Sequence, residues 1–99
     1  MNISILGTGS MASGLAVLFA RAGHQVTLAS RDPSRARALA AGLGGTIQGG
    51  PLAGAADSAG IVVLAVPFGA AADVIEAAGG LAGKIVIDIT NPMTADFRP

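Results

Sequence analysis

The spacing of small residues near the start of the chain is suited to holding a phosphate group against the protein backbone. Residues 7–12 form the pattern Gly-x-Gly-x-x-Ala directly after a short apolar run at residues 2–6. Gly7 allows a sharp turn off a strand, Gly9 has no side chain to keep a pyrophosphate away, and Ala12 lets the next helix pack closely. The first amides of that helix, at the positive end of its dipole, then face the phosphates. The pattern predicts a dinucleotide-binding loop, with a purely structural tight turn as the alternative.

The residues at the end of the second predicted strand indicate which dinucleotide binds. NAD-preferring sites usually carry Asp or Glu about 20 residues after the glycines, to accept hydrogen bonds from the ribose 2′-hydroxyl. This chain carries Ser30 and Arg31 there, and Arg35 follows near the start of the next helix. A guanidinium binds a 2′-phosphate with paired charge-assisted hydrogen bonds, whereas a carboxylate would repel it. Asp32 is expected to cap that helix, with Pro33 as its first residue. NADP is therefore expected over NAD; the alternative is an ordinary solvated helix face.

The rest of the chain alternates between segments typical of strands and of helices. Strands are predicted at residues 2–6, 25–29, 46–48, 61–66 and 85–89, and helices at about 10–22, 33–41, 51–57 and 70–78. The residues of the first helix expected to form its buried face are Met11, Leu15, Leu18, Phe19 and Ala22. Strands separated by helices imply parallel pairing with right-handed crossovers. The predicted fold is α/β, a doubly wound parallel sheet of about five strands in order 3-2-1-4-5, with helices on both faces.

This topology places the ligand crevice between the first and fourth strands, where the strand order reverses. Ala65, Val66 and Pro67 lie at the carboxyl end of the fourth strand and are expected beside the glycine loop, in contact with the cofactor. The alternative is an ordinary proline turn at the end of a strand. Asn91, after the fifth strand, is expected to border the nicotinamide end of the crevice, whereas Asp88 is expected to be structural. No catalytic residue is predicted.

Composition excludes several other kinds of site. The chain has 99 residues, enough for one domain, with 52% hydrophobic residues and a formal net charge of zero. Neither nucleic acid nor an anionic membrane is therefore an expected partner. The absence of cysteine excludes disulfides, and one histidine with six scattered acids makes no metal site. The apolar N-terminal stretch lacks the basic region of a secretory signal, so a cytoplasmic protein without a membrane span is expected.

Together these segments resemble the NADP-binding domain of the deazaflavin-dependent NADP oxidoreductases. The resemblance is carried by residues 1–12, Ser30-Arg31, residues 62–68 and residues 87–92, and it covers essentially the whole chain. That domain is similar to the cytosolic part of the six-transmembrane ferric reductases and to the N-terminal domain of pyrroline-5-carboxylate reductases. The resemblance implies a Rossmann domain over residues 1–99. It also implies a phosphate loop lined by Thr8, Ser10 and Met11, and a 2′-phosphate held by Ser30, Arg31 and Arg35.

The function implied is hydride transfer between NADP(H) and a deazaflavin or flavin-type acceptor. Such a transfer requires the alignment of two rings rather than a protein acid or base. Family members continue past the segment that ends this chain, through elements that build the deazaflavin pocket. A non-catalytic NADP-binding module or fragment is therefore the first alternative, and an imine reductase similar to pyrroline-5-carboxylate reductase is the second. Because exposed sheet edges pair readily, a homodimer is also expected.

Overall fold

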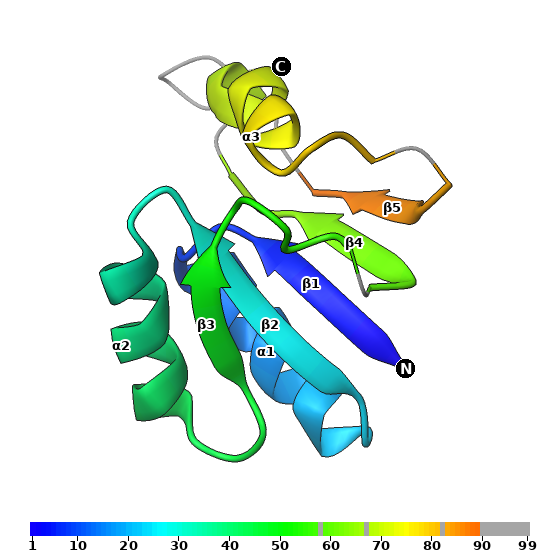
Figure 1. The fold of residues 1–99 in the computed structure, drawn as a ribbon. Helices are drawn as coiled ribbons and strands as arrows, with labels where there is room; N and C mark the ends of the chain where they lie inside the picture. Colours follow the sequence, from blue (N-terminus) through cyan, green and yellow to red (C-terminus); the bar gives the residue numbers. More distant parts are fainter. Residues whose placement is uncertain (58, 67, 82, 90–99) are drawn as a thin grey trace, which may run out of the picture.

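Five parallel strands form a single sheet in the order β3-β2-β1-β4-β5 (Figure 1). The computed structural model describes residues 1–57, 59–66, 68–81 and 83–89. The strands are β1 (Asn2–Leu6), β2 (Gln25–Ser30), β3 (Gln48–Pro51), β4 (Ile61–Leu64) and β5 (Ile85–Asp88). The predicted strand order and the Rossmann-like α/β fold are confirmed.

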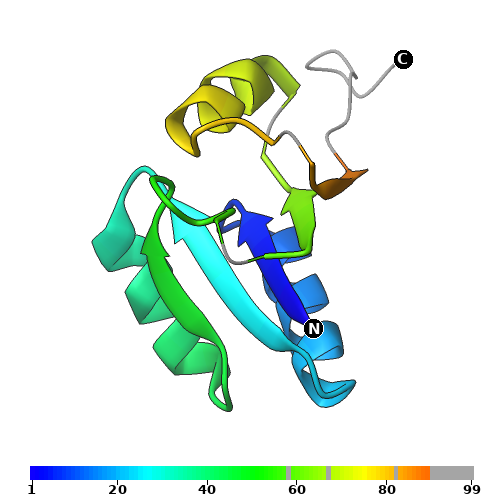
Figure 2. The same cartoon turned by 45° about the vertical axis from the view of Figure 1, so that its right-hand side comes forward.

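Three α-helices connect and cover the strands. They are α1 (Ser10–Arg21), α2 (Pro33–Leu43) and α3 (Ala71–Ala77), the last preceded by a 3-10 turn, η1 (Phe68–Ala70). In Figures 1 and 2, α1 and α2 lie against one face of the sheet, whereas α3 lies beyond the carboxyl end of β4. Among the described residues, no helix is long and apolar enough to cross a membrane.

Both faces of the central strands are buried, as expected for a parallel sheet. Side chains of β1 alternate between two apolar clusters: Ile3 and Ile5 pack with α1 and α2, and Leu6 packs with residues 52, 56 and 59 and with α3. Ser4 shares the second face and is only 3% exposed. Its hydroxyl donates a hydrogen bond to the carbonyl oxygen of Ala55 at 2.5 Å, so this buried polar group is satisfied.

The face that α1 presents to the sheet differs from the predicted one. Ala12 and Ala16 are fully buried, whereas Met11 and Leu18 are 65% and 63% exposed. Leu15 and Phe19 are only partly buried. The prediction followed the largest apolar side chains, but the glycine loop starts the helix close to β1. Only alanine-sized side chains fit in that narrow space.

The segment around β3 also differs from the prediction. The strand lies at Gln48–Pro51 rather than at residues 46–48, so it includes Gly49. A Cβ atom at Gly49 would collide with the carbonyl group of Ala36, because the backbone of α2 passes directly over this position. The strand therefore uses glycine for close packing against a helix.

The helix predicted at residues 51–57 is not formed. Two successive turns replace it, closed by hydrogen bonds from the Ala55 amide to the Leu52 carbonyl and from the Asp57 amide to the Gly54 carbonyl. Gly54 has a φ of 78°, in the left-handed region, which interrupts helical geometry. The Lys84 ammonium group donates to the carbonyls of Asp57 at 3.2 Å and Ala59 at 2.8 Å, which ties this segment to the start of β5.

Two neighbouring glycines of β3 give a test of the packing between α2 and the sheet. We expect Gly49→Ala to lower the free energy of unfolding by about 1–3 kcal/mol, because the added methyl group collides with helix backbone. Gly50 has no atom within 4 Å of a Cβ position. Gly50→Ala is therefore expected to be neutral or to stabilise by up to about 1 kcal/mol. Urea denaturation measures both; equal losses would contradict the packing role of Gly49.

Candidate functional site

The loop between β1 and α1 is fixed by the ends of the two strands that flank β1. The Gly7 amide donates to the Ala29 carbonyl at the end of β2, and the Ala65 amide donates to the Leu6 carbonyl, both at 2.9 Å. Gly7 has a φ of 137°, and a Cβ atom there would collide with the Ala65 carbonyl oxygen. Gly7 is therefore required for the shape of the loop and for the close approach of the chain after β4.

Gly9 has a different role, because it faces open space. It is the N-cap residue of α1, with φ −79° and ψ −174°, and no side chain caps the helix. No acidic residue lies in the first turn of α1, and no atom lies within 4 Å of a Cβ built on Gly9. The first amides of α1 are thus accessible from the side of Gly9. This arrangement accommodates an anionic group at the helix N-terminus.

The end of β2 presents polar groups whose positions are set by the start of α2. The Asp32 carboxylate accepts a hydrogen bond from the Arg35 amide at 3.3 Å, and Pro33 is the first residue of the helix. The predicted N-cap is therefore confirmed. The Ser30 hydroxyl oxygen accepts from the Asp32 amide at 3.1 Å, so the hydroxyl hydrogen can still be donated to a ligand.

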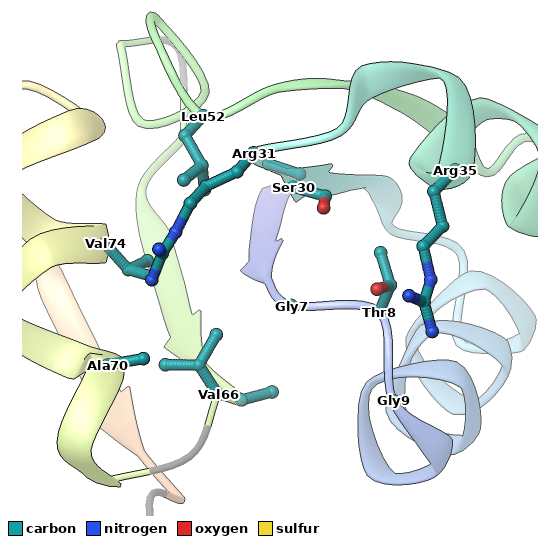
Figure 3. Close-up of a pocket in the computed structure, with 12 residues that line it drawn as sticks. Gly7, Thr8, Gly9, Ser30, Arg31, Arg35, Leu52, Val66, Ala70 and Val74 are labelled. Atoms are coloured by element: carbon teal, nitrogen blue, oxygen red, sulfur yellow. The ribbon is translucent and has the colours of Figure 1, made fainter.

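These segments enclose an open cavity of about 400 Å³ at the carboxyl ends of β1, β2 and β4 (Figure 3). That volume is typical of ligand sites. The cavity brings together eight residues predicted to contact the cofactor: Gly7, Thr8, Gly9, Ser30, Arg31, Arg35, Ala65 and Val66. Sequence reasoning missed four other lining residues: Ala29, Leu52, Ala70 and Val74. Leu52 follows β3, in the segment that was wrongly predicted to be a helix. For the other three residues, their apolar character was the only feature of the sequence that could have indicated a place in the cavity.

The other four predicted cofactor-binding residues differ from these eight. Ser10 and Met11 lie in the first turn of α1, exposed and outside the lining. Pro67 and Asn91 lie outside the described residues. The cavity is therefore built from the loop, the end of β2 and the segments after β3 and β4, rather than from the outer side of α1.

The two arginines approach the cavity from different directions. Figure 3 shows the Arg35 side chain directed toward Thr8 and Gly9, whereas Arg31 extends toward Val74 on α3. Ser30 lies at the end of the strand that precedes both of them. Within the described part of the chain, no Asp, Glu, His or Lys lines the cavity. The site thus combines positive charge with an uncapped helix N-terminus, a combination that favours a ligand with several anionic groups.

The opposite wall of the cavity is apolar. Leu52, Val66, Ala70 and Val74 form it, and they come from the segment after β3, the segment after β4, η1 and α3. An apolar wall facing a charged one suits a ligand that has both a ring system and phosphate groups. The described residues include no cluster of His, Cys, Asp or Glu able to hold a metal ion.

Comparison with known proteins assigns the family. A family model described as NADP oxidoreductase, coenzyme F420-dependent, matches residues 2–92. The chain belongs to this family. Its members are NADP-dependent oxidoreductases, which agrees with a site that combines a glycine loop and two arginines.

Related proteins extend beyond the matched segment. A crystal structure from Arthrobacter sp. FB24, assigned as an F420-dependent NADP reductase, is 31% identical, with a TM-score of 0.85 over 100% of this chain and 49% of that one. An imine reductase from Streptomyces aurantiacus is 25% identical, with a TM-score of 0.74 over 94% of this chain and 33% of that one. A glycerol-3-phosphate dehydrogenase [NAD(P)+] from Chlorobium luteolum is 37% identical over 90% of this chain and 31% of its own. The chain thus spans half or less of each of these relatives.

The glycine loop offers a pair of substitutions that separate ligand contact from folding. We expect Gly9→Ala to leave the stability nearly unchanged, because its backbone angles suit alanine and its Cβ meets no protein atom. It should weaken NADP binding by about tenfold or more, since the methyl group occupies the space beside the helix amides. Gly7→Ala should instead lower the free energy of unfolding, by about 1–3 kcal/mol. Calorimetric titration and urea denaturation measure the two effects; unchanged NADP affinity in Gly9→Ala would contradict this assignment.

Proposed function

We propose that this chain is the NADP-binding part of an oxidoreductase that transfers hydride between NADP(H) and a deazaflavin or flavin-type acceptor. The observation that carries the proposal is the convergence of Ser30, Arg31 and Arg35 with the glycine loop on one cavity. The only acid of that segment, Asp32, is held at the N-terminus of α2 and does not line the cavity.

The preference for NADP follows from the groups at the end of β2. A ribose 2′-hydroxyl would be recognised by a carboxylate, but the cavity offers a hydroxyl donor and two guanidinium groups instead. Arginine binds phosphate through forked, charge-assisted hydrogen bonds. Since Arg35 points toward Thr8 and Arg31 reaches across toward α3, a 2′-phosphate placed near Ser30 would lie between two positive charges.

The acceptor is inferred from the family and from the chemistry of the site. NADPH, when bound, supplies the hydride, so the tasks of the chain are to bind the nucleotide and to orient it. The glycine loop and the arginines supply binding, and the apolar wall excludes water from one side of a ring. A flavin-type acceptor fits this arrangement because hydride transfer between two aligned rings requires no protein acid or base.

A non-catalytic NADP-binding module is the second candidate. It accounts equally well for the cavity, whose described lining residues supply groups that bind a nucleotide. An imine reductase is a third candidate, supported by the 25% identical structure from Streptomyces aurantiacus. The activity of the whole protein depends on which acceptor, if any, is held beside the nucleotide.

The phosphate site is tested by titration calorimetry with NADP and with NAD. We expect tighter binding of NADP. Arg31→Ala and Arg35→Ala should each weaken it by about tenfold or more, because each removes charge-assisted hydrogen bonds to the 2′-phosphate. Their effect on NAD should be small. Arg37 is exposed on α2 away from the cavity, so Arg37→Ala is the matched control. If Arg37→Ala weakens NADP binding as much as the other two substitutions, the arginines act through the overall positive charge of the chain rather than through a phosphate site.

Turnover separates the three functional candidates. We expect NADPH oxidation with a reducible 5-deazaflavin or flavin acceptor, and no oxidation with cyclic imines. It can be followed by the loss of nicotinamide absorbance. The Arg37→Ala variant, which leaves the cavity unchanged, should show the same turnover as the unchanged chain. NADP binding without turnover on any acceptor would favour the binding module, and turnover of imines alone would favour the imine reductase.

A further inference from the structure

Ser4 is a polar residue at a position that a parallel sheet normally gives to an apolar one. It lies in the middle of β1, which pairs with β2 on one side and with β4 on the other. At 3% exposure, it is the one buried polar residue among those that the structure describes. A hydroxyl group in this environment costs free energy unless it is hydrogen-bonded. The hydrogen bond that it makes therefore indicates what the residue does.

The acceptor of that hydrogen bond belongs to the chain between β3 and β4, which crosses this face of the sheet without forming a helix (Figure 1). The Ser4 hydroxyl donates to the Ala55 carbonyl at 2.5 Å. The Lys84 ammonium group donates to the carbonyls of Asp57 at 3.2 Å and Ala59 at 2.8 Å. Side chains from the sheet thus satisfy carbonyls that a helix would have satisfied internally. Residues 52–57 are called the crossing segment below.

The crossing segment begins at the wall of the nucleotide cavity. Pro51 pairs with Ser30 in the sheet, so Leu52 follows directly beside the end of β2. Figure 3 shows Leu52 next to Arg31 at the cavity. Leu52 lines the cavity although it is only 4% exposed, because it packs into the same apolar cluster as Val74. The apolar wall is therefore the outer surface of a packed core, and its position depends on how that core is held.

A short path of hydrogen bonds joins Ser4 to this wall. The Ala55 amide donates to the Leu52 carbonyl at 3.0 Å, and the Ala55 carbonyl accepts from the Ser4 hydroxyl. The turn that starts at Leu52 is thus closed by a residue that is itself bound to the centre of the sheet. The polar groups of the sheet fix the segment, and the segment fixes the wall.

We propose that Ser4 and Lys84 are positioning residues for nucleotide binding, which hold the crossing segment so that Leu52 supports the adenine ring. This inference rests on the proposed binding of NADP in the cavity. The adenine and the 2′-phosphate are attached to the same ribose. With the 2′-phosphate near Ser30, the apolar surface beside it therefore faces the base. Holding this surface in place before binding removes the cost of ordering it afterwards.

Titration calorimetry with adenosine 2′,5′-bisphosphate and with NADP tests the proposal. Ser4→Ala and Lys84→Met remove the two kinds of donor, and each is expected to weaken binding of both ligands by about three- to tenfold. The matched control is Ile3→Val, because Ile3 is adjacent on β1 but packs into the other apolar cluster. It should lower stability and leave both affinities unchanged. Circular dichroism identifies a temperature at which every variant is folded, and Lys84→Met carries the test if Ser4→Ala does not fold.

A double-mutant cycle shows whether Ser4 acts through Leu52. Leu52→Ala should weaken binding of adenosine 2′,5′-bisphosphate, and adding Ser4→Ala or Lys84→Met to it should weaken binding little further. The position of the wall no longer matters once its side chain is removed. Losses that multiply in the double variants would overturn the proposed route. Equal weakening by Ile3→Val would mean that any loss of stability impairs binding, which also overturns it.

Hydrogen exchange tests the positioning without a nucleotide. The amides of Ala55 and Asp57 close the two turns of the crossing segment, and we expect both to exchange about tenfold faster in Ser4→Ala. The Gly44 amide, which donates to the Ala40 carbonyl at the end of α2, should be unaffected. Unchanged exchange at Ala55 and Asp57 overturns the positioning role. If the unchanged chain binds neither ligand, the proposed function fails together with this inference. If it binds both and the variants bind equally well, only this inference fails.

Discussion

The close approach of the chain after β4 to the turn at Gly7 is the contact on which the rest of the site depends. The Gly7 amide donates a hydrogen bond to the end of β2. The Ala65 carbonyl occupies the space that a side chain at Gly7 would need. Because three adjacent strands end at the same place, the first turn of α1 is presented at the carboxyl edge of the sheet. A looser packing here would separate the glycine loop from the segments that form the rest of the cavity.

Small residues serve different physical purposes around this contact. Gly7 and Gly49 are required because backbone of another segment occupies the space of a side chain, whereas Gly9 is open toward the cavity. Ala12 and Ala16 allow α1 to lie close to β1 and β2. The core therefore combines aliphatic side chains of the strands with short distances between backbones, in keeping with a chain that contains three aromatic residues.

Charge is distributed around the cavity in a way that a local pattern alone does not convey. Asp32 is adjacent in sequence to Arg31, yet its carboxylate is used at the N-terminus of α2. The arginines reach the cavity from different directions, and the apolar wall is supplied by residues distant in sequence from both.

The sequence by itself determined the strand order, the glycine loop and the identity of eight residues around the cavity. These features depend on local chemistry: a turn that requires glycine, a cap that requires Asp and Pro, and apolar runs typical of buried strands. The tertiary structure alone decided that β3 contains Gly49 and that residues 52–57 form turns. It also decided that Ala12 and Ala16, rather than Met11 and Leu18, face the sheet, and that Leu52 and Val74 complete the cavity. Those outcomes depend on how closely separate segments approach one another, which no pattern within a single segment specifies.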